Sequence, residues 1–238
     1  MDTSLKAAVY AVLISCVLVT RLWFVLPGLS SRNRPPKKSG STVRLAVFLG
    51  SGGHTSEALN LISALDFEQY SPRIYVASEG DALSVKKAQV LETLKAPNNA
   101  QYTILTVPRA RKVHQSLLTA PFTALLSFFK CAYYVTLLPI SKSTPGSKGF
   151  ADVLIVNGPG TCFILCLAVL VNKILGLPAP RIIYIESFAR VKSLSISGKL
   201  LRYIADSGLR SSEMGNGENA MKLDVILQAI DASPALRL

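Results

Sequence analysis

The sequence predicts an α/β protein in which a parallel sheet, covered by helices on both faces, follows an N-terminal transmembrane helix. Three observations support this fold class. Residues 7–26 are almost uninterruptedly apolar, short β-type runs then alternate with helix-length segments, and glycine-rich turns follow two of the expected strands. Alternation of strands and helices favours parallel strands, because each crossover helix returns the chain to the same end of the sheet.

The composition excludes several other classes of protein. Of the 238 residues, 50% are hydrophobic and 17% are charged, whereas a disordered chain has low hydrophobicity. Four cysteines and 15 glycines are too few for a disulfide scaffold or a collagen-like chain. The mean hydropathy of +0.37 predicts that part of the chain contacts a membrane. The length accommodates one nucleotide-binding domain but not two, so an enzyme that needs two must find the second on another chain.

Residues 7–26 form the expected membrane span. About 20 helical residues cover the hydrocarbon core of a bilayer. Arg21 is the one charge in this segment and lies near its end, where it can reach the interface, and Trp23 suits the same depth. A cleaved signal peptide is the alternative, because residues 7–20 alone have the length of its apolar core. No A-x-A pattern follows and apolar residues resume at 22–26, which favours the span.

The positive charges around the span predict its orientation. Lys6 precedes it, whereas five basic residues follow it with no acid among them: Arg32, Arg34, Lys37, Lys38 and Arg44. The side of a span that is richer in Lys and Arg stays in the cytoplasm. We therefore expect a cytosolic main domain, joined to the span by a basic linker, residues 30–42, that lies over anionic headgroups.

The remainder reads as alternating strands and helices. The strands are expected at residues 43–49, 73–77, 102–107, 152–156 and 181–185. The helices are expected at residues 56–65, 81–95, 115–138, 161–175 and 195–205. The strands are nearly continuous apolar runs, as in sheets that are covered on both faces.

The helix at 115–138 has two interpretations. Between residues 117 and 138 the only charge is Lys130, so the segment is long and apolar enough for a second span. We favour an amphipathic or partly buried helix for two reasons. Polar residues and a proline interrupt the segment, and a second span would place the following strands on the other side of the membrane.

Two glycine-rich turns at the carboxyl edge of the sheet indicate a phosphate-bearing ligand. The first strand leads into Gly50, Ser51, Gly52, Gly53, His54 and Thr55, and the fourth leads into Asn157, Gly158, Pro159, Gly160 and Thr161. Such turns expose backbone N–H groups at a helix N-terminus, where an anion is stabilised. Ligands of parallel sheets also lie beyond the carboxyl ends of the strands. Thr161 is expected to cap the helix that it begins.

Ionisable residues at the same edge are the candidates for chemistry. His54 begins a helix and can act as a general base toward an acceptor hydroxyl or donate to a phosphate; the alternative is a helix-capping role. Glu186, Arg190 and Lys192 follow the fifth strand and can bind a pyrophosphate or a sugar, or form an ordinary solvated helix entrance. Arg109 and Arg111 follow the third strand and suit a pyrophosphate or anionic lipid heads.

Other chemistries fit the sequence poorly. Thr55 stands where the dinucleotide fingerprint needs its third glycine, and no Gly-Lys-Ser/Thr of a P-loop follows. Cys162 and Cys166 lie in an apolar run without a nearby His, so we expect buried reduced thiols, no metal site and no cofactor. No RNA-binding aromatic motif or helix-turn-helix pattern occurs, so no nucleic-acid partner is expected.

Taken in order, the motifs at residues 50–57, 108–111, 157–162 and 186–199 resemble one family. It is the membrane-anchor subunit of the endoplasmic-reticulum UDP-N-acetylglucosamine transferase of asparagine-linked glycosylation. The resemblance extends from the N-terminal span to about Asp206. It implies one half of a split GT-B glycosyltransferase with a Rossmann-like fold.

The resemblance also implies partners and site residues. A separate soluble catalytic subunit would bring the UDP-GlcNAc half, and this chain, not active alone, would recruit it to the cytosolic face of the endoplasmic reticulum and present dolichyl-diphosphate-GlcNAc. The transferase adds the second GlcNAc to that acceptor. The two glycine loops would line the acceptor diphosphate and sugar. His54 resembles the histidine considered as general base in the related bacterial lipid-linked GlcNAc transferase, and Glu186 is the second catalytic candidate.

The residues and the resemblance together predict four parts of the chain. Residues 1–29 are the single-pass anchor with a lumenal N-terminus, 30–42 the linker, 43–206 the acceptor-side domain and 207–238 a divergent tail. The family usually continues after Asp206 through an aromatic strand to a short apolar C-terminus, whereas residues 207–219 are polar and glycine-rich here and residues 220–230 suit a short amphipathic helix. The last strand and the partner-binding tail are therefore expected to be missing or replaced. A membrane scaffold that has lost partner docking is the alternative function.

Overall fold

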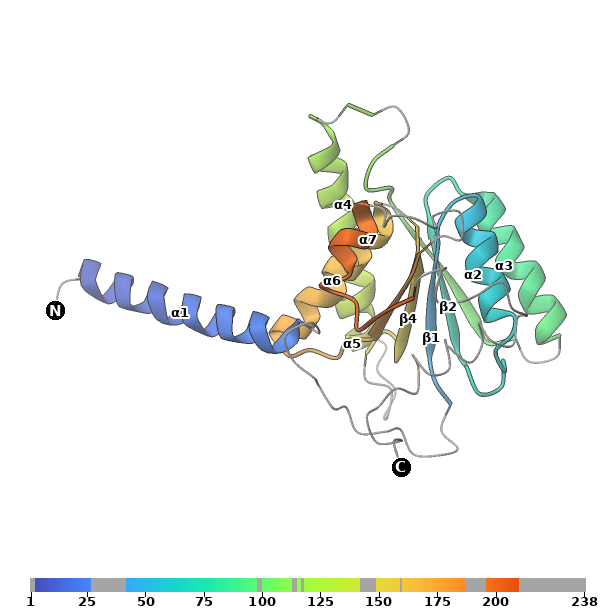
Figure 1. Ribbon diagram of the computed structural model, residues 1–238, viewed down its shortest axis with the longest axis horizontal. Coiled ribbons are helices and arrows are strands. Elements are labelled where there is room, and N and C mark those ends of the chain that lie inside the picture. Colours follow the sequence, from blue (N-terminus) through green and yellow to red (C-terminus); the bar gives the residue numbers. More distant parts are fainter. Residues whose placement is uncertain are drawn as a thin grey trace.

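The computed structural model describes residues 3–26, 42–97, 100–112, 115–116, 118–141, 149–158, 160–186 and 196–209. Helix α1 (Thr3–Val25) extends away from an α/β body, and its side chains from residue 4 onward are exposed except at Val25 near its end. The helix joins the body beside α6 (Thr161–Leu175), where Val25 is part of the core (Figure 1). Residues 4–25 are long and apolar enough to cross a membrane, as predicted.

The body is built on one parallel sheet with the strand order β3-β2-β1-β4-β5-β6. The strands are β1 (Leu45–Leu49), β2 (Arg73–Ser78), β3 (Tyr102–Val107), β4 (Val153–Asn157), β5 (Arg181–Ile185) and β6 (Ser207–Leu209). The central strand β1 pairs with β2 and β4, with Leu45 opposite Arg73 on one side and Val153 on the other. This order confirms the predicted fold class and is that of a doubly wound nucleotide-binding fold.

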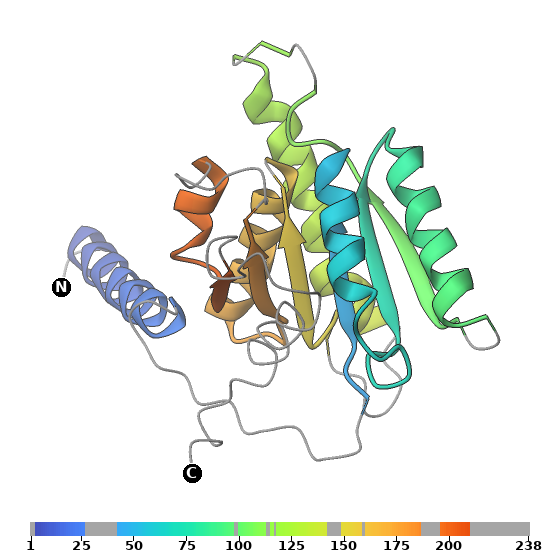
Figure 2. The same ribbon diagram turned by 45° about the vertical axis from the view of Figure 1, so that its right-hand side comes forward.

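Helices cover both faces of the sheet (Figures 1 and 2). On one face lie α2 (Gly53–Ile62) and α3 (Ala82–Lys95), and on the other lie α4 (Ala120–Ala132), α6 and α7 (Ile196–Leu201). All five residues of β1 are buried and alternate between the two layers: Ala46 and Phe48 pack toward α4 and α6, and Leu45, Val47 and Leu49 toward α2. The predicted two-sided burial therefore accounts for the unbroken apolar strands.

The long helix expected at 115–138 is a composite. It begins at Ala120, passes through one π-helical segment, η1 (Tyr133–Leu137), and ends in α5 (Leu138–Ser141). Pro139 has no N–H to donate to the carbonyl of Val135 four residues earlier. Asn172 of α6 donates its Nδ2–H to that carbonyl instead (3.4 Å) and accepts from Thr136 Oγ1 (2.7 Å). The irregular turn is thereby fixed against α6.

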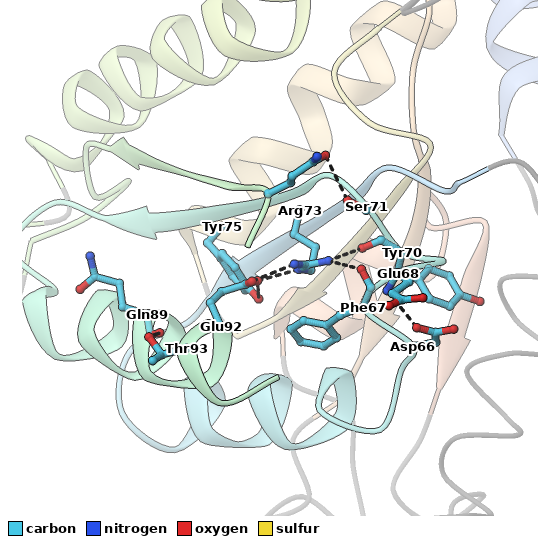
Figure 3. Close-up of polar contacts among 11 residues, drawn as sticks. Asp66, Phe67, Glu68, Tyr70, Ser71, Arg73, Tyr75, Gln89, Glu92 and Thr93 are labelled. Carbon is cyan, nitrogen blue, oxygen red and sulfur yellow. Dashed lines mark hydrogen bonds and ion pairs between the residues drawn. The ribbon is translucent and has the colours of Figure 1, made fainter. Parts of the chain in front are cut away.

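A buried polar cluster joins β2 to α3 at the amino edge of the sheet (Figure 3). Arg73 and Glu92 are 1% and 0% exposed, and they form a bidentate ion pair through Arg73 Nε and Nη2 at 2.6 and 2.8 Å. Arg73 Nη1 donates to the carbonyls of Phe67 and Tyr70, and Tyr75 donates its hydroxyl to Glu92 (2.7 Å). Burial, with Glu92 beside it, raises the pKa of Tyr75, so this hydroxyl stays protonated.

The sheet continues past the expected boundary at Asp206. Asp206 Oδ2 contacts Lys173 Nζ at 2.5 Å and accepts from the backbone N–H of Ile182 at 2.7 Å. These contacts align β6 beside β5, with Ser207 opposite Ile183. A strand therefore follows Asp206, but it is only three residues long and contains no aromatic residue, so the prediction that the family's final strand is replaced here stays a prediction. Residues 210–238, including the helix expected at 220–230, lie outside the described residues.

Candidate functional site

The two predicted glycine turns meet between β1 and β4, where the direction in which successive strands are added to the sheet reverses. From β1 the chain moves outward through β2 and β3, and then returns to β4 on the other side of β1. A Cβ atom on Gly158 would lie 3.4 Å from Gly50 Cα, and one on Gly50 would lie 2.7 Å from the Asn157 carbonyl oxygen. Only glycine at position 50 permits this approach. Crevices at such switch points are where parallel sheets bind ligands.

A chain of three polar side chains crosses this junction. His54 Nδ1 lies 2.8 Å from Asn157 Oδ1, and Asn157 Nδ2 donates to Glu57 Oε2 at 3.0 Å. An ionised carboxylate only accepts hydrogen bonds, so Glu57 turns the amide of Asn157 with its oxygen toward His54. That oxygen requires a proton on Nδ1 and leaves Nε2 as the basic nitrogen of neutral His54. Asn157 is 0% exposed, whereas the His54 side chain is 31% exposed.

Helices α2 and α6 both begin at a glycine with a positive φ. The N-cap residues are Gly52 (φ 67°) and Gly160 (φ 58°), both in the left-handed half of backbone space. Glycine has no side chain with which to cap the first turn, so the first N–H groups depend on solvent or a ligand. Ser51, Gly52 and Gly53 are exposed at the front of α2. This geometry fits the predicted anion site.

Thr55 does not face that site. It is 0% exposed, and its hydroxyl contacts the Gly50 carbonyl and Ser84 Oγ (2.7 Å). Ser84 is itself bonded to Asp81, the N-cap residue of α3. The hydroxyl of Thr55 therefore supports the first glycine turn from inside the fold, and the predicted contact of Thr55 with the acceptor stays a prediction.

Thr161 also has another role than predicted. The N-cap of α6 is Gly160, and Thr161 is 7% exposed with its Oγ1 accepting from the backbone N–H of Ala110 (3.1 Å). The helix-capping prediction is thus wrong, because the hydroxyl is occupied by another loop. This bond ties the basic loop after β3 to the second glycine turn, although β3 and β4 are not neighbours in the sheet.

The hydrogen bond between Ala110 and Thr161 holds the neighbouring Arg109 and Arg111 at the carboxyl edge of the sheet. Arg109 Nε donates to the carbonyl of Glu79 (3.1 Å), and Arg111 donates to that of Gln115 (2.9 and 3.1 Å). Both guanidinium groups are held by backbone oxygens, so their positive charges are not neutralised by these bonds. Their charge adds to the positive potential near the two helix N-termini.

Glu186 follows β5 at the same edge but lies inside the protein. It is 4% exposed and accepts from the hydroxyl of Tyr184 at 3.0 Å. Nearby, burial raises the pKa of the Cys162 thiol to about 12, with the charge of Glu186 as a lesser cause, so this thiol stays protonated at neutral pH. Arg190 and Lys192 lie outside the described residues.

The sequence interpretation assigned no role to Glu57 and Ser84. Glu57 stands three residues after His54, a spacing that places both on one side of a helix, and this spacing was the available signal. Ser84 is brought to Thr55 only by the packing of α3 beside α2, which no local pattern predicts.

Known proteins resemble the chain over most of its length. A family profile described as "Oligosaccharide biosynthesis protein Alg14 like" matches residues 45–213. The chain is 45% identical over 206 residues to "UDP-N-acetylglucosamine transferase subunit ALG14" of Cryptococcus neoformans, covering 85% of this chain and 86% of that protein.

The chain belongs to the Alg14 family. The family resemblance drawn from the four motifs is thereby confirmed. The protein of the same name from Homo sapiens is 36% identical over 198 residues, covering 81% of this chain and 83% of the human protein. Among solved structures, MurG of Acinetobacter baumannii matches with a TM-score of 0.43 and 18% identity, covering 70% of this chain and 40% of MurG. The Alg14 profile includes β6, consistent with the extension of the sheet past Asp206.

Proposed function

We propose that this chain is the membrane-anchoring, acceptor-binding subunit of a heteromeric transferase that adds the second GlcNAc to dolichyl-diphosphate-GlcNAc. The observation that carries the proposal is the His54–Asn157–Glu57 chain of hydrogen bonds at the junction of the two glycine turns. It presents one basic nitrogen beside two helix N-termini, in a member of a family whose relatives are named as UDP-N-acetylglucosamine transferase subunits.

The proposed step is a glycosyl transfer to a hydroxyl of the acceptor sugar. The acceptor oxygen attacks the anomeric carbon of UDP-GlcNAc, the bond from that carbon to the diphosphate breaks, and UDP leaves with the bonding electrons. His54 Nε2 takes the proton of the attacking hydroxyl. The positive charge that forms on His54 is stabilised by the carboxylate of Glu57, whose Oε2 lies 3.8 Å from His54 Nδ1.

The acceptor diphosphate belongs beside the N-termini of α2 and α6, where Gly52, Gly53 and Gly160 are exposed. Gly52, Gly53 and Gly160 offer backbone N–H groups there, and Arg109 and Arg111 add positive charge from the adjoining loop. Arg190 and Lys192, which follow Glu186 in the sequence, are proposed as further ligands of the diphosphate.

The anchoring role rests on α1 and on the charges that follow it. A lumenal N-terminus, a cytosolic α/β body and residence in the endoplasmic reticulum membrane are part of the proposal. The chain supplies one half of a GT-B enzyme, and a soluble catalytic subunit supplies the half that binds UDP-GlcNAc. We therefore expect no transfer from this chain alone.

The test is GlcNAc transfer from UDP-GlcNAc to a phytanyl- or dolichyl-diphosphate-GlcNAc acceptor in membranes. The full chain is assayed alone and together with the catalytic subunit. The His54→Ala variant of this chain is then assayed together with the same catalytic subunit. Transfer should require both chains. His54→Ala should lower the transfer rate by about 10²–10⁴-fold, the usual contribution of a general base, while co-purification of the two subunits is unchanged.

Three results would contradict the proposal, each in a different part. Transfer by this chain alone would contradict the split enzyme. Full transfer by the His54→Ala variant would show that His54 is not the general base and would leave only the anchoring role. Loss of co-purification in every mixture, with the chain folded, would instead favour the scaffold that no longer docks its partner.

A further inference from the structure

The apolar segment α4–η1–α5 has an exposed face that the proposed transferase does not use. Residues 120–141 form the second helix long and apolar enough to cross a membrane, with a mean hydropathy of 1.4 against 2.1 for the N-terminal span. Ser127, Cys131 and Val135, spaced by four residues, are buried on one side. The other side carries a continuous stripe of exposed large apolar residues: Leu118, Phe122, Leu125, Leu126, Phe129, Tyr133, Leu137 and Ile140.

The sheet excludes a second membrane crossing at this segment. The chain enters it from β3 and leaves it toward β4, and both strands belong to one parallel sheet through β2 and β1. A crossing would put β3 and β4 on opposite sides of the bilayer and break the sheet. The buried side of α4 also packs in the core with α6, whose Asn172 fixes the π-helical turn. Whatever covers the apolar stripe must therefore bind it while the opposite side of the helix stays packed in the folded body.

The charges around the stripe match an anionic lipid surface. From residue 96 to residue 141 the sequence contains no acidic residue and four basic ones, Arg109, Arg111, Lys112 and Lys130. Within the stripe, Lys130 Nζ lies 5.0 and 5.5 Å from the ring centres of Tyr134 and Tyr133. Tyrosine and lysine with apolar neighbours are the residues that occupy the boundary between headgroups and acyl chains.

The direction of α1 agrees with this assignment. Helix α1 meets the body on the side of α4, α6 and α7, and the two views show α4 running across the direction of α1 (Figures 1 and 2). If α1 follows the membrane normal, α4 lies parallel to the membrane surface, on the side of the body that faces it. Helices α2 and α3 then face away from the bilayer.

We propose that α4–η1–α5 is an in-plane membrane helix, with its stripe from Leu118 to Ile140 inserted among the headgroups and upper acyl chains of an anionic bilayer. It gives the body a second, reversible contact with the membrane in which α1 is anchored. Such helices bury their apolar face by roughly 5–10 Å. The basic loop after β3, which Thr161 ties to the glycine turns, thereby lies between the lipid surface and the candidate site. The proposal requires a membrane-spanning α1 but no transferase activity.

Depth-dependent fluorescence quenching of the full chain in nanodiscs tests the proposal. Single cysteines carrying an environment-sensitive dye replace Phe122, Leu126 or Phe129 on α4, in a Cys16→Ser background in which the remaining native thiols are buried. Matched controls replace Leu83, Val90 or Leu94, exposed apolar residues of α3 in the other layer. Lipids brominated at shallow or deep acyl positions are the quenchers, and no substrate or partner subunit is present.

The expected result is quenching at all three α4 positions to a similar extent, stronger with shallow than with deep bromines, and none at the α3 positions. Replacing phosphatidylserine by phosphatidylcholine should weaken the quenching if the basic residues contribute. A steady change of depth from Phe122 to Phe129 would show a membrane crossing and overturn the proposal. Absence of quenching on α4 would also overturn it and would leave a protein partner as the occupant of the stripe. Either failure leaves the transfer assay, and so the proposed function, unaffected.

Discussion

The hydrogen bonds of a single amide, that of Asn157, favour one tautomer of His54. We predict that Asn157→Ala lowers the rate of GlcNAc transfer by roughly tenfold or more, because it removes the acceptor that holds the Nδ1 proton and leaves Glu57 without its amide partner. The chain has only two histidines, so ¹⁵N NMR of the imidazoles can resolve His54. The wild-type spectrum should show the Nδ1–H tautomer, and Asn157→Ala should lose that preference.

Asn60→Ala is the matched control on the exposed side of α2. It should change neither the tautomer nor the rate. A wild-type spectrum dominated by Nε2–H would contradict the proposed orientation of Asn157, whatever the kinetics of the variant.

Close backbone contact between the two glycine turns makes Gly50 a stability determinant. In Gly50→Ala the new Cβ would lie 2.7 Å from the Asn157 carbonyl oxygen and 2.8 Å from His54 Cβ, so the turns must separate. Overpacking of this kind costs about 1–3 kcal/mol of unfolding free energy. At Gly53 a Cβ would meet nothing within 4 Å, so Gly53→Ala should keep or slightly raise stability. Thermal unfolding of the two full-length variants in detergent measures the difference, and equal melting temperatures would contradict it.

Individual residues also show how far the sequence predicts the site. That Gly50, His54 and Asn157 meet follows from their positions after two parallel strands, since parallel strands end at the same edge. The inward direction of Thr55 and Thr161 does not follow, because a turn sequence does not say which hydroxyl faces the interior. Ser84 and Ala110, which bind these hydroxyls, lie 29 and 51 positions away in the chain. Such contacts arise only from tertiary packing.

At the scale of elements, periodicity predicted the strands and helices well where they are long. The five expected strands all occur, and the helices at 161–175 and 81–95 agree within a residue. β6 was missed because three residues, one of them glycine, carry no strand pattern, and its alignment depends on the contacts of Asp206. The π-helical turn was missed because it depends on Pro139 together with Asn172 of another helix.

The Arg73–Glu92 pair is an element-scale prediction, because it joins β2 to α3. Arg73→Met leaves the buried Glu92 carboxylate without its cation, and removal of one partner of a buried pair costs about 3–5 kcal/mol. The double variant Arg73→Met/Glu92→Leu should recover most of that loss, since no charge is then buried alone. Urea unfolding followed by far-UV circular dichroism is the measurement, because the only tryptophan, Trp23, lies in α1 and does not report on the body. Additive losses in the double variant would contradict the argument.

For the molecule as a whole, the sheet and the flanking charges lead to the same topology. The charges after α1 predict a cytosolic body, and a sheet that joins strands on both sides of α4 must lie wholly in one compartment. The sequence alone left a second crossing open because hydropathy does not report pairing between distant strands. The pairing of β1 with β4 removes that ambiguity.

This topology predicts the labelling of intact microsomes by a membrane-impermeant maleimide. Glu68→Cys, before α4, and Arg202→Cys, after it, are both exposed and should react without detergent, in a Cys16→Ser background. An N-terminal epitope tag should resist added protease until the membrane is opened, because the proposed topology places the N-terminus in the lumen. If only one of the two cysteines reacted, the chain would cross the membrane between them and the single sheet could not form. If both reacted but the tag were digested, α1 would not span the bilayer, and α4–η1–α5 would be the remaining candidate contact with the membrane.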